Sequence, residues 1–331
     1  LIIKSNSSVT GSLITNTSVS GSISIERYIE GYNGISGNGW HYISSPIDDF
    51  TVSGSDFHPG VSDDLFYYDE PSDMWINWKS STFNFEKEMG YLCAYYDDEV
   101  KTFSGTINTE GFDINNLTLT SGGNGTEDGW NLLGNPFTSA LEWNNGDWGL
   151  TNIVGVTKVW PGTGNWGDIA ADGIIPAMNG FMVQVSSGTI GSLTIPASAR
   201  THSSQAWYKS DEQVLKLFIS GGGNTFSDEA IIKFNNEATV DFDMQFDSHK
   251  LFGVASAPKL FTRIDQELFS TNTFPNPEID REIDMDFIPG TSGEYTIEVL
   301  ENSVSASSIY LKDLVTGQMI DLTDKTTYTF S

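Results

Sequence analysis

Gly39-Trp40-His41-Tyr42-Ile43-Ser44-Ser45-Pro46 is the stretch that decides the fold, because a second version of it appears later in the chain as Gly129-Trp130-Asn131-Leu132-Leu133-Gly134-Asn135-Pro136. Both copies begin with Gly-Trp, continue with apolar residues and end with Pro. A motif that returns in one chain indicates that the same structural unit is built twice.

Further landmarks follow each copy in the same order. Phe66-Tyr67-Tyr68 matches Lys158-Val159-Trp160, and Met89-Gly90-Tyr91-Leu92 matches Asn179-Gly180-Phe181-Met182. Between these landmarks, the second Trp lies 35 residues after the first in one copy and 36 residues after it in the other. The conserved order and spacing predict two units of one plan. We expect four segments, namely an N-terminal β segment at 1–29, β repeats at 30–120 and 121–205, and a C-terminal β-sandwich at 211–331.

Short apolar and aromatic runs dominate the whole chain. Gly, Asn, Ser, Thr and Asp interrupt these runs about every eight to twelve residues, which is the pattern of antiparallel β structure. We therefore predict an all-β protein with two tandem Trp-containing β-sandwich-like repeats. The C-terminal segment lacks that Trp pattern, and its alternating strands and Gly/Asn/Pro turns predict a jelly-roll-type β-sandwich. A short helical turn is expected near 139–143.

The N-terminal 29 residues have a different rhythm. Short apolar runs at 1–4, 11–14 and 21–25 read as strands, separated by turns rich in Ser, Thr and Asn. Gly11 and Gly21 are ten residues apart. This segment is either the last coil of an upstream β-solenoid or a β-hairpin that leads into the next domain, and we favour the solenoid.

Composition limits the function. The 331 residues carry 16 basic and 44 acidic side chains, a net charge of −28. Such a charge repels nucleic acids and anionic membranes and is compatible with neutral ligands and cations. No apolar run approaches the roughly 18 residues of a membrane span, so we expect no membrane insertion. Cys93 is the single cysteine and takes the place of Val183 in the repeat, which favours a small core side chain over a nucleophile.

Catalytic motifs are missing from the sequence. The four histidines are far apart, and no zinc-protease, nucleophile-elbow, P-loop or dinucleotide-binding pattern occurs. Acidic pairs such as Asp63-Asp64 are too numerous to single out a glycosidase pair. We therefore expect no catalytic residues, and a hydrolase with a carboxylate pair is the least favoured alternative.

Tryptophan is the residue that points to a ligand. Nine Trp residues are present, and a flat indole stacks on a sugar ring while its N–H bonds a hydroxyl. The Trp residues repeated in both copies are expected in the cores. The segment 143–148 places two indoles around a polar turn, and we expect at least one of them to be exposed. The predicted carbohydrate-binding residues are Trp143, Asn144, Asp147, Trp148, Trp160, Trp166 and Trp78. The two aromatic-flanked loops at 68–75 and 160–166 are expected to form paired rims.

A calcium site is the one cofactor that the sequence suggests. Asp241, Asp243 and Asp247 alternate with apolar residues, so an extended strand would place the three carboxylates on one face. Calcium prefers several oxygen ligands. A solvated polar face opposite a core face is the alternative explanation. No other cofactor is expected.

Several stretches together resemble uncharacterised multidomain exported proteins of Bacteroidetes that use the type IX secretion system. They are 25–29 with the first Gly-Trp motif, the motif at 130–136, the segment 238–251, and 310–314 before 328–330. The resemblance implies a secreted or cell-surface protein with a C-terminal sorting domain beyond residue 331 and repetitive β structure upstream. The chain begins at Leu1 without Met, and we expect it to belong to a longer polypeptide with further domains.

Two non-catalytic functions follow from these patterns. We favour an extracellular binding or adhesion region whose partner is a glycan or cell-surface polysaccharide. The alternative is a structural stalk or spacer, in which every Trp would be buried and no aromatic surface would be presented.

Overall fold

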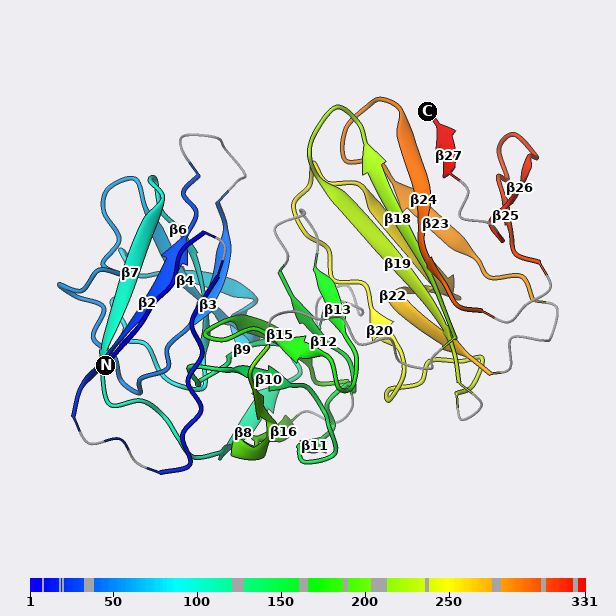
Figure 1. The fold of residues 1–331 in the computed structure, drawn as a ribbon. Coiled ribbons are helices and arrows are strands. Elements are labelled where there is room, and N and C mark those ends of the chain that lie inside the picture. The colour runs from blue at the N-terminus through cyan, green and yellow to red at the C-terminus, as the bar shows by residue number, and fades with distance from the viewer. Residues whose placement is uncertain are drawn as a thin grey trace. The chain divides into compact units, whose positions relative to one another are not determined.

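The computed structural model describes residues 1–7, 9–17, 19, 21–32, 39–120, 128–160, 166–186, 190–203, 213–235, 238–275, 281–304, 308–323 and 327–331 (Figure 1). The chain divides into two compact units. The first comprises Leu1–Gly162 and Ile169–Trp207, and the second comprises Thr163–Asp168 and Tyr208–Ser331. Both are built from β-strands, which confirms the predicted all-β, sandwich-like fold.

The first repeat pairs two sheets around one hydrophobic core. Its larger sheet has the order β3-β6-β4-β5, with strands β3 (His41–Ser44), β4 (Asp64–Asp69), β5 (Met74–Asn77) and β6 (Gly90–Ala94). Strand β2 (Ile23–Ile29) pairs antiparallel with β7 (Glu99–Gly105). Ile25 and Phe103 from this pair meet Ile43 and Leu65 from the larger sheet in the core. Because side chains alternate along a strand, Tyr42 and Phe66 lie on the opposite face.

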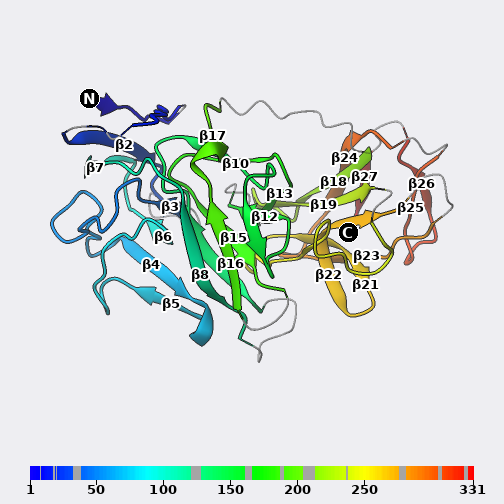
Figure 2. The same ribbon diagram turned by 90° about the horizontal axis from the view of Figure 1, so that it is seen from below.

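The second repeat has the same plan. Its larger sheet has the order β9-β15-β12-β13, with β9 (Trp130–Gly134), β12 (Thr157–Val159), β13 (Gly167–Ile169) and β15 (Gly180–Gln184). A second sheet has the order β11-β16-β8, and β8 (Phe112–Thr118) and β16 (Ile190–Ile195) run side by side (Figure 2). The remaining strands are β10 (Ala140–Glu142), β11 (Gly149–Thr151), β14 (Ile174–Ile175) and β17 (Arg200–Thr201).

The strand register of the two repeats is equivalent at these positions. Ile43 pairs with Tyr91 in the first repeat, and Leu133 pairs with Phe181 in the second. Each residue of the second pair lies 90 positions after its counterpart. Strands β2 and β8 precede the repeated Gly-Trp motifs and pair with β7 and β16, so each repeat includes a strand from the segment before its motif. A strand, β10, replaces the helical turn expected near 139–143.

The two repeats contact each other through reciprocal backbone interactions. The Ser44 N–H donates to the Met178 carbonyl at 3.1 Å, and the Gly134 N–H donates to the Glu88 carbonyl at 3.0 Å. At the repeat offset of 90 residues, Ser44 corresponds to Gly134 and Met178 corresponds to Glu88. The two hydrogen bonds are therefore the same bond made in both directions between the repeats. Isolated bridges show the same exchange, since Ile43 pairs with Asn179 and Leu133 pairs with Met89. A contact that is its own counterpart in this way has local two-fold symmetry.

Glycine permits this contact. A Cβ on Gly90 would lie 2.4 Å from the Leu133 carbonyl oxygen, and a Cβ on Gly134 would lie 2.4 Å from the Met89 carbonyl oxygen. Both carbonyls belong to the opposite repeat. Because the obstacle is backbone, neither repeat can admit a side chain here without separating from the other.

The N-terminal segment joins both repeats. Strand β1 (Ile2–Ile3) pairs in parallel with β2, so these two strands do not form a hairpin. Residues 11–14 form no strand, contrary to expectation. Instead the Leu13 N–H donates to the Thr138 carbonyl at 3.1 Å, and the Thr138 hydroxyl donates back to the Leu13 carbonyl at 2.7 Å.

The second unit is one eight-stranded sheet with a covering hairpin. The sheet has the order β23-β21-β22-β19-β18-β24-β27, with β20 beside β22. The longest neighbours, β18, β19 and β24, are prominent in Figure 1. Hairpin β25–β26 contributes Leu311 and Ile320 to the core on one face of the sheet. The strands are β18 (Gln213–Gly221), β19 (Ser227–Phe234), β20 (Ser248–His249), β21 (Lys259–Ile264), β22 (Glu267–Phe274), β23 (Met285–Ile288), β24 (Tyr295–Asn302), β25 (Tyr310–Lys312), β26 (Met319–Asp321) and β27 (Thr327–Phe330).

We predict that Gly90→Ala destabilises the first unit. The added methyl group meets the Leu133 carbonyl, and relieving this overlap by backbone movement costs about 2 kcal/mol. Urea denaturation followed by far-UV circular dichroism measures the change. Gly149→Ala is the matched control, because its Cβ would meet only the Thr194 hydroxyl, at 3.2 Å. Equal urea midpoints for the two variants would contradict the proposed close approach.

Candidate functional site

Both indoles of the segment at 143–148 are buried, and the expectation of an exposed indole there is wrong. Trp143 is fully buried and Trp148 is 7 % exposed. The Trp143 indole N–H donates to the Gly155 carbonyl at 2.7 Å, and that of Trp148 donates to the Glu142 carbonyl at 2.8 Å. Their rings meet edge to face at 4.6 Å. Both indoles thus close over the second repeat's core, with their polar groups satisfied.

The other residues predicted around this segment divide between core and surface. Trp78 and Trp166 are buried, and the Trp78 indole N–H donates to the Phe83 carbonyl at 3.0 Å. Asn144 is half-buried at φ +46°, and Asp147 is exposed. Of the seven predicted residues, Trp160 is the one that keeps a half-exposed aromatic ring. The structure therefore does not gather the seven into one site.

A different set of rings forms a partly exposed aromatic group. Tyr42 lies at the centre of this group and is almost completely buried. The centre of its ring is 6.0 Å from that of Trp75 and 5.8 Å from that of Trp160. Around it stand half-buried rings from the first repeat's larger sheet and the second repeat's loop after β12. We call this set the aromatic cluster; its members are Trp40, Tyr42, Phe66, Tyr68, Trp75 and Trp160.

Strand alternation explains the cluster. Tyr42, Phe66 and Tyr68 point away from the first repeat's core, whereas their neighbours Ile43 and Leu65 point into it. Trp75 pairs with Tyr68 across β4 and β5, with the ring centres 5.0 Å apart. Trp160 is the ring that the second repeat contributes to the cluster. Of the expected paired rims at 68–75 and 160–166, Trp75 and Trp160 each lie near the Tyr42 ring. Residues 161–165 lie outside the described part.

Polar groups adjoin the rings. The Tyr68 hydroxyl donates to the Asp73 carboxylate at 2.8 Å, and burial together with this bond raises the pKa of Tyr68. Glu70 is buried and accepts hydrogen bonds from the Thr118 and Thr120 hydroxyls and from the Thr120 N–H at 2.7 Å. Among the described residues, the indole N–H groups of Trp40 and Trp75 have no hydrogen-bond partner. The cluster therefore offers flat apolar rings, free donors and negative charge.

The corresponding positions of the second repeat are closed. By the repeat alignment, Trp130 takes the place of Trp40, and Lys158 takes the place of Phe66. Trp130 and Lys158 are both buried, with the ammonium 5.3 Å from the indole ring centre. Trp130 matches the expectation that repeated Trp residues are core, but half-buried Trp40 and Trp75 do not. Sequence symmetry could not reveal this difference, because it depends on what covers each copy.

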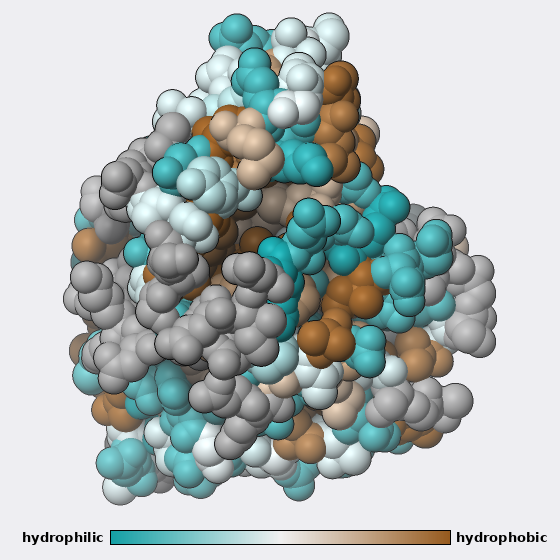
Figure 3. All heavy atoms as spheres, turned by 90° about the vertical axis from the view of Figure 1, so that its right-hand side faces the viewer, coloured by the Kyte–Doolittle hydropathy of each residue, from teal (hydrophilic) through white to brown (hydrophobic). Residues whose placement is uncertain are grey.

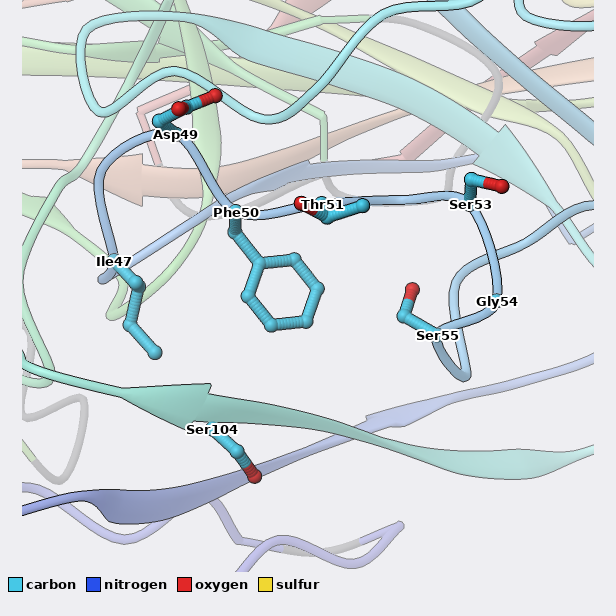
Figure 4. Close-up of a pocket in the computed structure, with 8 residues that line it drawn as sticks. All are labelled: Ile47, Asp49, Phe50, Thr51, Ser53, Gly54, Ser55 and Ser104. Atoms are coloured by element: carbon cyan, nitrogen blue, oxygen red, sulfur yellow. The ribbon is translucent and has the colours of Figure 1, made fainter.

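A shallow recess of about 400 Å³ lies beside the loop at 47–55 (Figure 4). Its rim carries the hydroxyl groups of Thr51, Ser53 and Ser104, and Phe50 forms an apolar wall. The Ser55 hydroxyl donates to the Val52 carbonyl at 2.8 Å. Phe50 in turn packs on the rings of the first repeat's core. The recess is thus chiefly the surface of a turn over that core.

The expected calcium ligands do not lie on one face of a strand. Residues 239–247 form turns, and their carboxylates accept backbone N–H groups. Asp247 accepts from Asp243 and Thr273, both at 2.7 Å, and Asp243 accepts from Thr239 at 2.8 Å. Among the described residues, no group of three or more acidic, His or Cys side chains is arranged to hold a metal ion. The carboxylates of Asp243 and Asp247 thus bond backbone N–H groups within the second unit.

The thiol of Cys93 and the imidazole of His41 both have pKa values that are shifted by burial. Cys93 is fully buried, as predicted, and burial raises the pKa of its thiol to about 12, so it stays protonated at neutral pH. The His41 ring contacts the Glu30 carbonyl at 2.8 Å, and burial lowers its pKa. His41 and Cys93 are cross-strand partners in β3 and β6, and no hydrogen bond joins their side chains in the described part of the chain.

The surface of the second unit carries scattered apolar residues. On the face drawn in Figure 3, hydrophobic residues form small groups separated by hydrophilic ones. The turn of hairpin β25–β26 exposes Leu314 and Val315. In the described part of the chain, no helix has the length and hydrophobicity needed to cross a membrane.

Comparison of the chain with protein-family models, with curated proteins and with solved structures gave no match.

Trp143→Ala tests the buried role of the 143–148 segment. Removing a buried indole leaves a cavity and an unpaired Gly155 carbonyl, so we expect the free energy of unfolding to fall by about 3–5 kcal/mol. Urea denaturation measures the loss. Asp147→Ala, at the exposed turn of the same segment, is the control and changes it by less than about 0.5 kcal/mol. A stable Trp143→Ala variant would show that the indole is not part of the core.

Asp247 gives the second unit a defined pH dependence. Burial raises its pKa from 3.8 to about 7, so the unfolded chain ionises before the folded one as pH rises. The carboxyl therefore lowers the free energy of unfolding progressively between about pH 4 and pH 7. Asp247→Asn removes this term, so the stability difference between wild type and variant changes across that range. Exposed Asp241→Asn keeps the wild-type profile, and identical profiles for all three proteins would contradict the assignment.

Proposed function

We propose that this chain is a non-catalytic extracellular binding region and that a glycan binds at the aromatic cluster. The observation that carries the proposal is the presence of half-exposed Trp75 and Trp160, whose rings both lie within about 6 Å of the Tyr42 ring. Indoles of this kind stack on the apolar faces of sugar rings. The predicted site thus moves from the buried indoles at 143–148 to the contact between the repeats.

Hydrogen-bonding groups beside the rings support a polar ligand. Trp40 and Trp75 each present an unbonded indole N–H within the described structure, and Asp73 is an exposed acceptor next to Tyr68. Sugar binding combines such stacking with donors and acceptors that fix the orientation of the hydroxyls. The net charge of −28 favours neutral over anionic polysaccharides.

The resemblance to exported Bacteroidetes proteins of the type IX secretion route supports a secreted or cell-surface location. A glycan-binding region would serve such a protein by holding it, or a neighbouring domain, on a polysaccharide surface. We propose no catalytic residue for this chain, and calcium has no part in the proposed site.

A structural spacer is the second candidate function. Five of the Trp residues, namely Trp78, Trp130, Trp143, Trp148 and Trp166, are buried. Reciprocal backbone hydrogen bonds join the two repeats, and the Leu13 N–H, which donates to the Thr138 carbonyl, joins the N-terminal segment to the second repeat. These features suit a stiff element that separates other domains.

Acrylamide quenching of tryptophan fluorescence, with and without a panel of neutral and anionic polysaccharides, tests the proposal. We expect a neutral glycan to protect part of the fluorescence. Trp75→Ala and Trp160→Ala should then weaken binding of that glycan at least about tenfold in calorimetry, because each removes a stacking ring.

Tyr310→Ala is the matched control, since Tyr310 is an exposed aromatic of the second unit outside the cluster, and it should bind as wild type does. Binding that survives both Trp variants would place the ligand elsewhere. Absence of protection by every glycan would favour the spacer.

A further inference from the structure

A lysine and an aspartate are enclosed together inside the second unit. Lys250 follows β20, and Asp228 lies near the start of β19. The Lys250 ammonium nitrogen is 2.7 Å from one carboxylate oxygen of Asp228 and 2.6 Å from the other. Both side chains are 1 % exposed. Nucleophile and carboxyl carbon are therefore held next to each other, out of water.

The burial of this pair has an energetic cost. Removing an ammonium and a carboxylate from water is unfavourable for each ion, and their mutual attraction recovers this cost only in part. Burial raises the pKa of Asp228 despite its contact with Lys250. Transfer of the ammonium proton to the carboxylate gives a neutral amine beside a neutral acid, which a dry site tolerates better.

Backbone groups complete the arrangement. The Leu260 N–H donates to Asp228 Oδ2 at 2.7 Å. A donor at this distance stabilises the negative charge that develops on a carboxyl oxygen when an amine adds to the carbon. The Glu229 carbonyl lies 3.4 Å from the Lys250 nitrogen and orients the amine. Held so closely, two groups react with a high effective concentration.

We propose that Lys250 and Asp228 form an intramolecular isopeptide bond. The amine nitrogen of Lys250 adds to the carboxyl carbon of Asp228, and the tetrahedral intermediate then expels one oxygen as water. One C–N bond forms and one C–O bond breaks. The neutral amine loses one hydrogen and keeps the other as the amide N–H, and the lost hydrogen leaves with the carboxyl OH as water; no oxidant, reductant or activating group takes part.

The bond would hold together parts of the second unit that are distant in sequence. It would join β19 to the chain after β20 and close a loop of 22 residues, which includes the turns at 239–247. Cross-links of this kind restrict the unfolded chain and resist proteolysis and pulling. The proposal concerns a different unit from the aromatic cluster and does not depend on glycan binding.

Intact-mass spectrometry of the purified full chain under denaturing conditions tests the proposal. We expect a mass lower than that of the sequence by one water molecule. Trypsin should then fail to cleave after Lys250 and should release residues 217–233 joined to residues 234–259 as a branched peptide. Tandem mass spectrometry locates the junction at the two side chains.

Lys250→Arg preserves the positive charge but supplies no primary amine, so its mass should equal that of its sequence. Lys216→Arg is the matched control, because Lys216 pairs with the adjacent Glu229 at 3.3 Å at a more exposed position, and it should retain the loss of one water. Wild-type protein with the full sequence mass would overturn the proposal, as would a water loss that persists in Lys250→Arg. The wild-type measurement decides the matter even if the variant does not fold.

Discussion

Close backbone contact between the two repeats is the constraint on which the first unit depends. At Gly90 and Gly134 the chain of one repeat touches a carbonyl of the other, and no side chain fits between them. Reciprocal hydrogen bonds from Ser44 and Gly134 then fix the two larger sheets in one register. The arrangement has the self-complementary form of a two-fold dimer, although a single chain supplies both halves. Each half completes its own core with a pair of strands from its flanking segments.

This packing also decides which aromatic rings remain accessible. The faces of the larger sheets that point away from the cores carry Trp40 and Tyr42 in one repeat and Trp130 and Leu132, both buried, in the other. In the second repeat the Trp is covered and a buried lysine lies against it. In the first repeat the rings remain half-exposed around Tyr42. Two nearly equivalent surfaces thus acquire different accessibility, and the more open one is the proposed glycan site.

Ionisable groups are buried in the interior of the second unit. Asp228 and Lys250 neutralise each other in contact, and Asp247 is enclosed but bonded to two backbone N–H groups. Buried polar groups are tolerated when their hydrogen-bonding capacity is met. The segment 239–247 looked like an amphipathic strand because its polar and apolar residues alternate. It forms turns instead, because short Asp side chains bond their own backbone and stabilise turns in competition with a strand.

By itself, the sequence determined the β class, the two repeats and part of the apolar side chains in their cores. Apolar alternation and the recurrence at 90 residues report local pairing and burial, which depend on neighbours along the chain. Cys93 in the first core and its counterpart Val183 in the second follow from that pattern. Only the tertiary structure decided that Trp143 and Trp148 close over a core, that Trp75 and Trp160 meet around Tyr42, and that Lys250 reaches Asp228. These contacts join residues from different strands or different repeats, and their burial depends on what packs above each sheet, which no local pattern records.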